Sequence, residues 1–294
     1  MPFTTIYGGS PSTRVIGDGT AIEQALHPTV MNYIAEMRSP TGGNYAMSVN
    51  EIDAVNNMVQ AMVANGIWSK MRAVYPVIGG TAAAHKYNLV DPRDADAAFR
   101  LAFNGGGWTH SSTGMTPNGT SSWANTFLNL STVLSVSSGH MSFYSRNQSL
   151  LATNIDMGAA SLIGSPDICN LAIGRNTNAS SFTWGTQTTN TIPIFSSSSS
   201  QGFFVGNQNA ATAAGRNIYR NGIVGVSATV YGTPVMPNAT MAIGALNNPS
   251  QGGAALFSSR QCAFASIGTG LTPEEVKAFS TIVQTYQTKL GRAV

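Results

Sequence analysis

Apolar residues follow a helical period near the two ends of the chain and a strand period between them. From residue 21 to residue 38 they are mostly three or four positions apart, which predicts a helix. Pro28 is expected to break or kink this helix, or to start its second half, because proline lacks the N–H that a helix interior needs. The apolar positions of this helix are Ile22, Leu26, Val30, Ile34 and Met37.

A second N-terminal helix is predicted by a capping box at residues 48–51 (SVNE), in which Ser48 and Glu51 each satisfy a free amide of the first turn. Asn65 and Gly66 are expected to end this helix. Helices of this length are marginal alone in water, so both apolar faces need a partner. The apolar face of the second helix holds Ile52, Val55, Val59, Met62 and Val63.

The middle of the chain consists of short runs with alternating apolar and polar residues, separated by Gly, Asn and Ser. This pattern is typical of an all-β sandwich or barrel. Asn221 and Gly222 predict a two-residue hairpin turn that brings Tyr219 close to Val224. The predicted strands lie within residues 77–81, 98–103, 108–115, 124–128, 140–145, 170–173, 182–184, 202–206, 217–226, 241–246 and 263–267.

The C-terminus returns to helical spacing at about residues 271–291. Thr272 is the predicted N-cap, Pro273 suits the first turn, Glu275 reaches back to the cap, and Gly291 closes the helix. One apolar stripe along this helix is expected to pack on its own sandwich or on a neighbouring subunit. The stripe consists of Val276, Phe279, Ile282, Val283, Tyr286 and Leu290.

The composition favours a neutral, turn-rich β-protein. Only 9% of the 294 residues are charged, whereas about a quarter is usual, and 31 are glycine. The net charge of +3 comes without a basic stripe, so nucleic-acid binding is not expected. The first residues do not resemble a secretory signal, and no apolar run approaches the roughly 20 residues of a membrane span. Cys169 and Cys262 are interpreted as two buried thiols.

Three segments in order resemble a laminin G-like (concanavalin A-like) jelly roll. Residues 218–222 (IYRNG) are similar to a strand with its Asn-Gly hairpin, and residues 241–245 (MAIGA) are similar to the strand that follows. Residues 263–268 (AFASIG) and 271–275 (LTPEE) resemble the last strand and the closing helix. The resemblance implies a mainly β fold, an antiparallel sandwich with an N-terminal helical arm and a C-terminal amphipathic helix.

A closer resemblance, from about residue 67 to the end, is to a group of tailed-bacteriophage virion proteins with tail, fibre or head-associated roles. It is carried by residues 75–81 (YPVIGGT), 85–94 (HKYNLVDPRD), 99–104 (FRLAFN), 107–110 (GWTH) and 260–267 (RQCAFASI). The resemblance implies a virion location after assembly in the host cytoplasm, with other virion proteins and further copies of the chain as partners. It brings no catalytic residues with it.

The first 66 residues match this group less well. We therefore divide the chain into residues 1–76, an extended arm with helices for attachment and oligomerisation, and residues 77–294, the sandwich with its closing helix. The alternative is that the N-terminal helices cover the open face of their own sandwich, because sheet faces need cover.

Glycoside hydrolysis is the enzymatic activity that this fold suggests. It needs two carboxylates that face one cleft. Between residues 101 and 250 the chain has only Asp156 and Asp167, and neither has an acidic neighbour at strand spacing. Glu51 and Asp53 have part of the required pattern but follow a helix cap. The chain is therefore expected not to be an enzyme, and no catalytic residue is assigned.

Two kinds of binding site have candidates. Asp91, Asp94 and Asp96 form the best cluster for calcium, which needs several oxygen ligands, although Asp side chains in such a turn often cap free amides beside Arg93 or Arg100. Calcium is therefore the one cofactor considered, and no metal site is assigned. The candidates for binding a glycan are Trp184, Trp108 and His110, and the alternative for each tryptophan is packing in the core or in an interface.

These patterns predict a non-enzymatic protein, and the resemblance to phage virion proteins implies that it is a structural component of a tailed-phage virion that acts through protein–protein assembly. The alternative is a receptor-binding module for a glycan of the host surface. A polysaccharide-degrading enzyme is the second alternative, and the shortage of paired carboxylates disfavours it.

Overall fold

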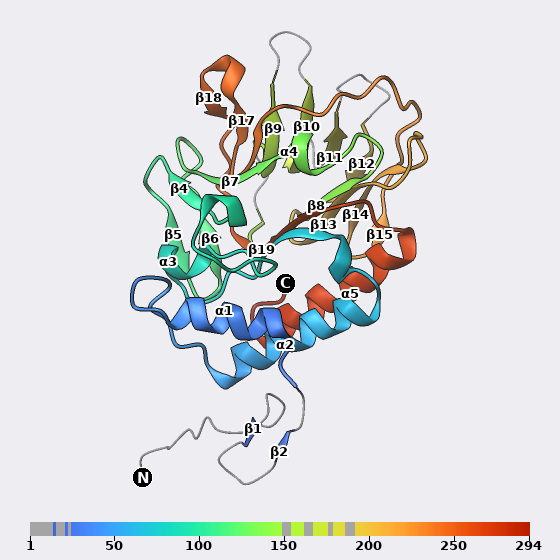
Figure 1. The fold of residues 1–294 in the computed structure, drawn as a ribbon. Coiled ribbons are helices and arrows are strands. Elements are labelled where there is room, and N and C mark those ends of the chain that lie inside the picture. The colour runs from blue at the N-terminus through green and yellow to red at the C-terminus, as the bar shows by residue number, and fades with distance from the viewer. Residues whose placement is uncertain are drawn as a thin grey trace.

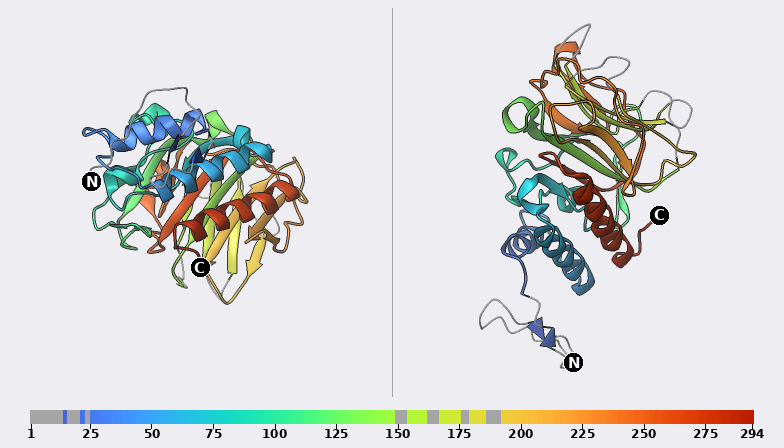
Figure 2. Two further views of the ribbon diagram at one scale, coloured as in Figure 1. Left: turned by 90° about the horizontal axis from the view of Figure 1, so that it is seen from below. Right: turned by 90° about the vertical axis from the view of Figure 1, so that its right-hand side faces the viewer.

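Three layers make up the molecule: two β-sheets packed face to face, and helices on the outer face of one sheet (Figures 1 and 2). The computed structural model describes residues 14–15, 21–22, 25–148, 154–161, 167–175, 179–185 and 192–294. The expected antiparallel β-sandwich with a C-terminal helix is confirmed. Most of the predicted arm at residues 1–20 lies outside the described residues.

The nine-stranded sheet has the order β12-β11-β10-β9-β16-β7-β4, with β17 beside β9 and β18 beside β17. Neighbouring strands are antiparallel except β17 and β9, which are parallel. Its strands are β4 (Ala102–Asn104), β7 (Trp123–Asn129), β9 (Met157–Ala160), β10 (Ile168–Arg175), β11 (Ala179–Trp184), β12 (Ile194–Ser196), β16 (Thr240–Ile243), β17 (Leu246–Asn248) and β18 (Gly253–Ala255).

The eight-stranded sheet has the order β15-β14-β13-β8-β19-β6-β5, and β3 also pairs with β19. Its pairs are antiparallel throughout. Its strands are β3 (Met71–Tyr75), β5 (Thr109–Ser111), β6 (Gly114–Thr116), β8 (Gly139–Ser145), β13 (Gly202–Gln208), β14 (Arg216–Arg220), β15 (Ile223–Val224) and β19 (Cys262–Gly268). A small separate pair joins β1 (Arg14–Val15) to β2 (Ala21–Ile22).

The central strands of the eight-stranded sheet have two buried faces. Phe143 and Phe204 belong to the core between the sheets, whereas the adjacent Tyr144 and Phe203 belong to the core beneath the helices. Successive side chains of a strand point to opposite faces, so both faces of these strands are apolar. Every residue of β8, β13 and β19 is consequently buried.

The helical layer consists of three long helices that lie side by side on this sheet (Figure 2). Phe279 of the C-terminal helix lies edge-on to Phe203, with 5.1 Å between the ring centroids, and packs against Phe264 as well. The predicted stripe of this helix therefore covers its own sandwich. The helices are α1 (Pro28–Arg38), α2 (Val49–Ala64), α3 (Ala82–His85), α4 (Leu130–Val133) and α5 (Pro273–Lys289), with 3₁₀ turns η1 (Trp68–Lys70), η2 (Asp96–Ala98) and η3 (Pro249–Gln251).

The first turns of α2 and α5 agree with the capping motifs found in the sequence. The capping boxes of α2 and α5 are both formed, through Ser48 with Glu51 and through Thr272 with Glu275. The helix predicted from residue 21 begins only at Pro28, which occupies the first turn after the N-cap His27. Proline is tolerated there because the N–H groups of the first turn have no partner within the helix.

Residues 77–81 were expected to form a strand and a turn. The turn is present, but the strand is not, since the strand of this region is β3 at Met71–Tyr75. Val77 has a φ of 55°, and Gly79 and Gly80 have φ values of 101° and 76°, so the backbone turns there and cannot extend. β3 lies before the boundary expected at residue 76, yet it pairs with β19 of the sandwich.

The predicted hairpin is confirmed. Asn221 and Gly222 have φ values of 50° and 80°, as a type I′ turn requires, and Tyr219 lies opposite Val224. The turn brings Gly222 next to α5, where its nearest neighbours are Ser280 and Lys277.

Candidate functional site

The aspartates around residue 94 are charge-paired with basic side chains. The hydrogen bond from Arg93 lowers the pKa of Asp91, although partial burial opposes the shift. Calcium requires about six to eight oxygen ligands, and carboxylates that already face cations do not fit it. Within the described ranges, no group of three or more His, Cys, Asp or Glu is placed to hold a metal ion. The pairs are Asp91 with Arg93, Asp94 with Lys86 and Asp96 with Arg100, at 2.5, 2.6 and 2.7 Å between nitrogen and oxygen.

Trp184 was a candidate for glycan binding, and the structure corrects this assignment. Its side chain is fully buried between the sheets, stacked on Phe182, and its Nε1 donates to the carbonyl of Ser135 over 3.1 Å. Gly139 lies directly against the ring, where any Cβ would collide with it. A ring enclosed in this way has no face left for a sugar.

The other two glycan candidates lie together in a half-buried aromatic cluster. Trp108 stacks on His110 with 5.9 Å between the ring centroids, and Phe103 meets both rings edge-on. Phe103 belongs to β4 and His110 to β5, which are the end strands of the two sheets on the same side of the sandwich. The cluster therefore spans from one sheet to the other at this edge.

The tautomers of the histidines in this cluster follow from their hydrogen bonds. The N–H of Gly80 donates to Nε2 of His85, so neutral His85 carries its proton on Nδ1. This Nδ1 lies 2.9 Å from Nδ1 of His110, which must accept and therefore carries its own proton on Nε2. Burial, together with the neighbouring His110, lowers the pKa of His85 to about 3, so the pair is neutral at pH 7. The cluster thus combines a tryptophan ring with an N–H donor, a pairing that sugar sites use.

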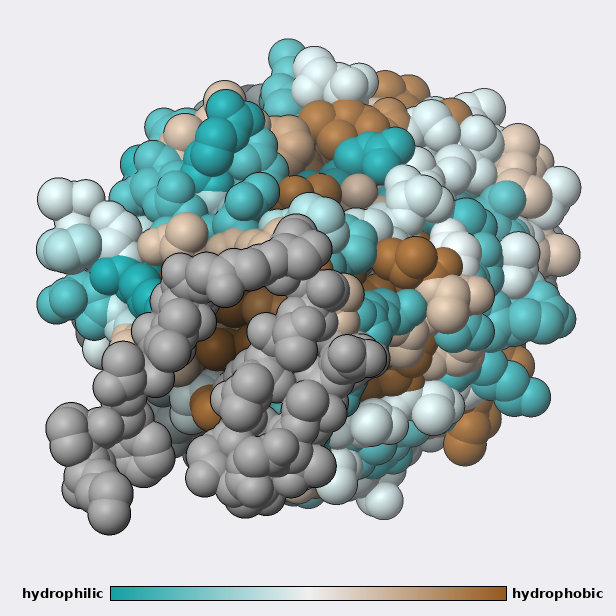
Figure 3. Space-filling view, turned by 60° about the horizontal axis from the view of Figure 1, so that its bottom comes forward, coloured by the Kyte–Doolittle hydropathy of each residue, from teal (hydrophilic) through white to brown (hydrophobic). Residues whose placement is uncertain are grey.

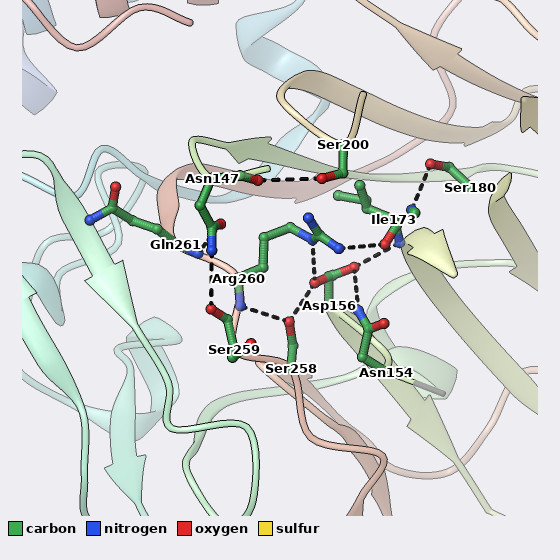
Figure 4. A network of polar contacts seen from close by, with 11 residues as sticks. Asn147, Asn154, Asp156, Ile173, Ser180, Ser200, Ser258, Ser259, Arg260 and Gln261 are labelled. Carbon is green, nitrogen blue, oxygen red and sulfur yellow. Dashed lines mark hydrogen bonds and ion pairs between the residues drawn. The ribbon is translucent and has the colours of Figure 1, made fainter. Parts of the chain in front are cut away.

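Asp156 is an acidic residue that could be mistaken for a catalytic group. Its side chain is fully buried in a polar network (Figure 4). Its carboxylate accepts from Arg260 Nε at 3.1 Å, Ser258 Oγ at 2.6 Å, the Ile173 N–H at 2.7 Å and Asn154 Nδ2 at 3.2 Å. Arg260 also donates to the carbonyl of Ile173. These bonds tie β9, β10 and the segment before β19 together, so the carboxylate is structural.

Both cysteines are buried free thiols, as expected. Burial raises the pKa of the Cys169 thiol and of the Cys262 thiol well above the usual range. A thiol that does not ionise near neutral pH is a poor nucleophile.

An uncharged aliphatic edge, which the sequence predictions missed, lies along one side of the described part of the chain. β15 ends the eight-stranded sheet and β12 ends the nine-stranded sheet, and an antiparallel bridge between Ile194 and Val226 joins the two on one side (right in Figure 1). We call this surface the valine-rich edge. Its residues are Ile194, Ile223, Val224 and Val226, which are 42%, 66%, 49% and 73% exposed, followed along the chain by Val230 and Val235, which are 45% and 52% exposed.

A signal for this edge was present in the sequence. No Asp, Glu, Lys or Arg occurs in residues 176–215 or in residues 221–259. Exposed edge strands are usually protected by charged side chains, and neither β12 nor β15 contains a charged residue. On the face that carries the helices, hydrophobic residues also reach the surface in several places between polar ones (Figure 3).

Among the described residues, no helix has both the length and the apolar character that crossing a membrane requires.

No protein-family model matches the chain, and no curated protein does. Solved structures resemble it weakly. One is domain 4 of an extracellular GH43 arabinanase from Geobacillus stearothermophilus in complex with arabinotriose, at 14% identity over 72% of this chain and 98% of that one, with a TM-score of 0.38.

Two further structures cover more of this chain or reach higher scores. A Trypanosoma rangeli sialidase mutant displaying trans-sialidase activity is 9% identical over 81% of this chain and 40% of its own, with a TM-score of 0.49. The binding domain of botulinum neurotoxin DC in complex with rat synaptotagmin II is 9% identical over 73% and 52%, with a TM-score of 0.47. The architecture rests on the strand pairing and the layers described above: this chain is a two-sheet antiparallel β-sandwich with a helical layer on one face.

Proposed function

We propose that this chain is a non-enzymatic structural component of a tailed-phage virion, and that it acts through protein–protein contacts. The observation that carries the assembly role is the valine-rich edge. Contiguous exposed apolar surface without charge marks interaction sites, because it is costly to leave in water. The virion part of the proposal rests on the resemblance of residues 75–110 and 260–267 to phage virion proteins.

The low charge of the chain supports the same proposal. A free protein of this size usually relies on surface charge for solubility. A subunit whose neutral surface is covered by neighbours does not need that charge, and only 9% of this chain is charged.

The test is to quantify the chain in purified particles by mass spectrometry against isotope-labelled peptides. A fixed copy number per particle, retained after washing in high salt, is expected. A chain that is abundant in the lysate of infected cells and absent from the purified particles would refute the proposal.

A second candidate function is glycan binding at the aromatic cluster. Two hydrogen bonds favour it: the N–H of Gly80 donates to His85, and His85 donates to His110. They leave the Nε2–H of His110 as a donor beside the half-buried Trp108. A glycan array would test this candidate with the variant Trp108→Ala. The matched control is Trp68→Ala, because Trp68 lies in η1 on the helical side. Glycan binding that is lost in the first variant and kept in the second would support the candidate, and no binding by the parent chain would exclude it for the glycans on the array.

A further inference from the structure

The two histidines of the aromatic cluster have no ring nitrogen that can take up a proton without breaking a hydrogen bond. In each neutral imidazole, one nitrogen carries a proton and the other is an acceptor. The acceptor of His85 is Nε2, which receives the N–H of Gly80 over 3.1 Å. The acceptor of His110 is Nδ1, which receives the Nδ1–H of His85 over 2.9 Å. A further proton on either ring therefore breaks one of these two bonds.

Arg292 is a cation that acts on this pair from the C-terminal segment. Its guanidinium is buried and donates to the carbonyls of Pro76 and Val77 at 2.8 and 2.7 Å. Burial, His110 and Arg292 all lower the pKa of His85, and burial lowers the pKa of His110. A proton on the pair is therefore unfavourable as long as the structure stays closed.

The carboxylates on the adjoining segments are bound to other side chains. Asp94 is paired at 2.6 Å with Lys86, the residue that follows His85. Glu51 accepts at 2.9 Å from the hydroxyl of Tyr45, whose ring lies against the turn at residues 77–80. Neither carboxylate is available as a counter-ion for a protonated histidine.

The strand that carries His110 has main-chain support on one side. β5 ends the eight-stranded sheet and, among the described strands, pairs only with β6, through three residues. Its other neighbour is the turn at residues 77–80, where Gly80 closely approaches the backbone of Ser111. Segments with so few main-chain bonds open at low cost, so the bond between His85 and His110 matters for holding β5 in place.

We propose that acid opens the sandwich at this edge: a proton taken up by His110 breaks its hydrogen bond with His85, and β5 separates from α3. His110 takes the proton first, because it is half-buried whereas His85 is only 1% exposed. When the ring of His110 turns away, Trp108 loses the ring on which it stacks, and His85 becomes accessible to a second proton. That proton goes to Nε2 and releases the N–H of Gly80.

The direction of the pH dependence follows from the lowered pKa values. In the opened form both rings reach water, where a histidine has a pKa of about 6.5. The closed form is therefore fully favoured above pH 6.5 and loses this advantage as the pH falls. Each pH unit below 6.5 favours the opened form by about tenfold for each histidine that opening frees.

The experiment is hydrogen–deuterium exchange of the purified full chain at pH 7 and pH 5, read by mass spectrometry and corrected for the intrinsic exchange rate at each pH. His110→Asn keeps an acceptor oxygen near the position of Nδ1 and cannot take up a proton. His27→Asn is the matched control, because His27 is also half-buried and caps α1, and asparagine is a good N-cap. Circular dichroism verifies that each variant is folded.

We expect residues 76–86 and 103–113 of the parent chain to lose protection at least tenfold more than β13 between pH 7 and pH 5. The His27→Asn variant should behave like the parent, and the His110→Asn variant should lose this difference. A parent chain in which the two segments keep their protection, or lose it only together with β13, would overturn the switch whatever the variants do. A folded His110→Asn variant that opens as the parent does would also overturn it.

This switch is independent of both proposed functions, because exchange is measured on the chain alone. A chain that binds glycans and does not open in acid would refute the switch and keep the glycan-binding function. A chain that opens in acid, binds no glycan and is absent from particles would do the reverse.

Discussion

Arg260 and Asp156 are both fully buried and form an ion pair, with 3.1 Å between Nε and Oδ1, although 104 residues separate them in the chain. A buried ion pair contributes little net stability by itself, but removing one partner leaves a charge without compensation at a cost of about 3–5 kcal/mol. We therefore expect Asp156→Ala to lower the free energy of unfolding by about that amount. Urea denaturation would measure it, with Asp167→Ala as the control, because Asp167 is not buried. Equal effects of the two substitutions would contradict the role assigned to the network.

The two buried histidines predict that acid destabilises the fold. Burial lowers the pKa of His140 to about 4 and that of His85 to about 3, against an unfolded value of about 6.5. Below pH 6.5 the unfolded chain binds protons that the folded chain does not, so stability is full above that pH and falls toward pH 4. Each histidine adds a slope of about 1.4 kcal/mol per pH unit in this window.

The measurement is the free energy of unfolding at pH 7, 6, 5.5 and 5, where carboxylates with lowered pKa values do not yet titrate. His140→Gln should reduce the slope by about one proton, even if its stability at pH 7 is lower. A stability that is independent of pH between 6.5 and 5 would show that these imidazoles are not held neutral.

The hairpin turn makes Gly222 sensitive to substitution. Gly222 has a φ of 80°, a conformation that is costly for a β-branched residue, so Gly222→Val should lower stability by ~1 kcal/mol or more. Ile223→Thr, an exposed position in the same hairpin, should change it by less than about 0.5 kcal/mol. Thermal melting of both variants checks this, and an unchanged midpoint for Gly222→Val would count against the turn.

The packing of α5 predicts a large effect at Phe279. This side chain is fully buried against Phe203 and Phe264, so Phe279→Ala should cost about 3–5 kcal/mol. Lys277→Ala on the exposed side of the same helix should stay within roughly 0.5 kcal/mol of the parent. Chemical denaturation measures both, and a small effect at Phe279 would mean that the helix does not pack on the sheet in solution.

No hydrolysis of polysaccharide is expected. Asp156 already accepts a hydrogen bond from Arg260 and three more from Ser258, Ile173 and Asn154. Glycoside hydrolysis needs a pair of carboxylates that face one cleft. Incubation with a panel of glycans should release no reducing ends. Release that disappears in an Asp156 or Asp167 variant would make the chain an enzyme.

Elements whose contacts are local were determined by the sequence alone. The capping boxes of α2 and α5 join residues three positions apart, and the turn at Asn221 and Gly222 requires only that these two residues tolerate positive φ. The apolar stripe of α5 could also be predicted from the sequence, because its period reflects one face of one helix. For such features, the physical cause and its partner lie within a few residues of each other.

The tertiary structure decided everything that depends on distant partners. The sequence around Trp184 is compatible with a site residue and with a core residue. The side chain is buried only because the two sheets pack together. The hydrogen bond between His85 and His110 joins residues of α3 and β5. The valine-rich edge exists because β12 and β15 end their sheets side by side, which an uncharged stretch of sequence permits but does not specify. Burial and exposure depend on which strands become neighbours, and that order is set by the free energy of the whole fold.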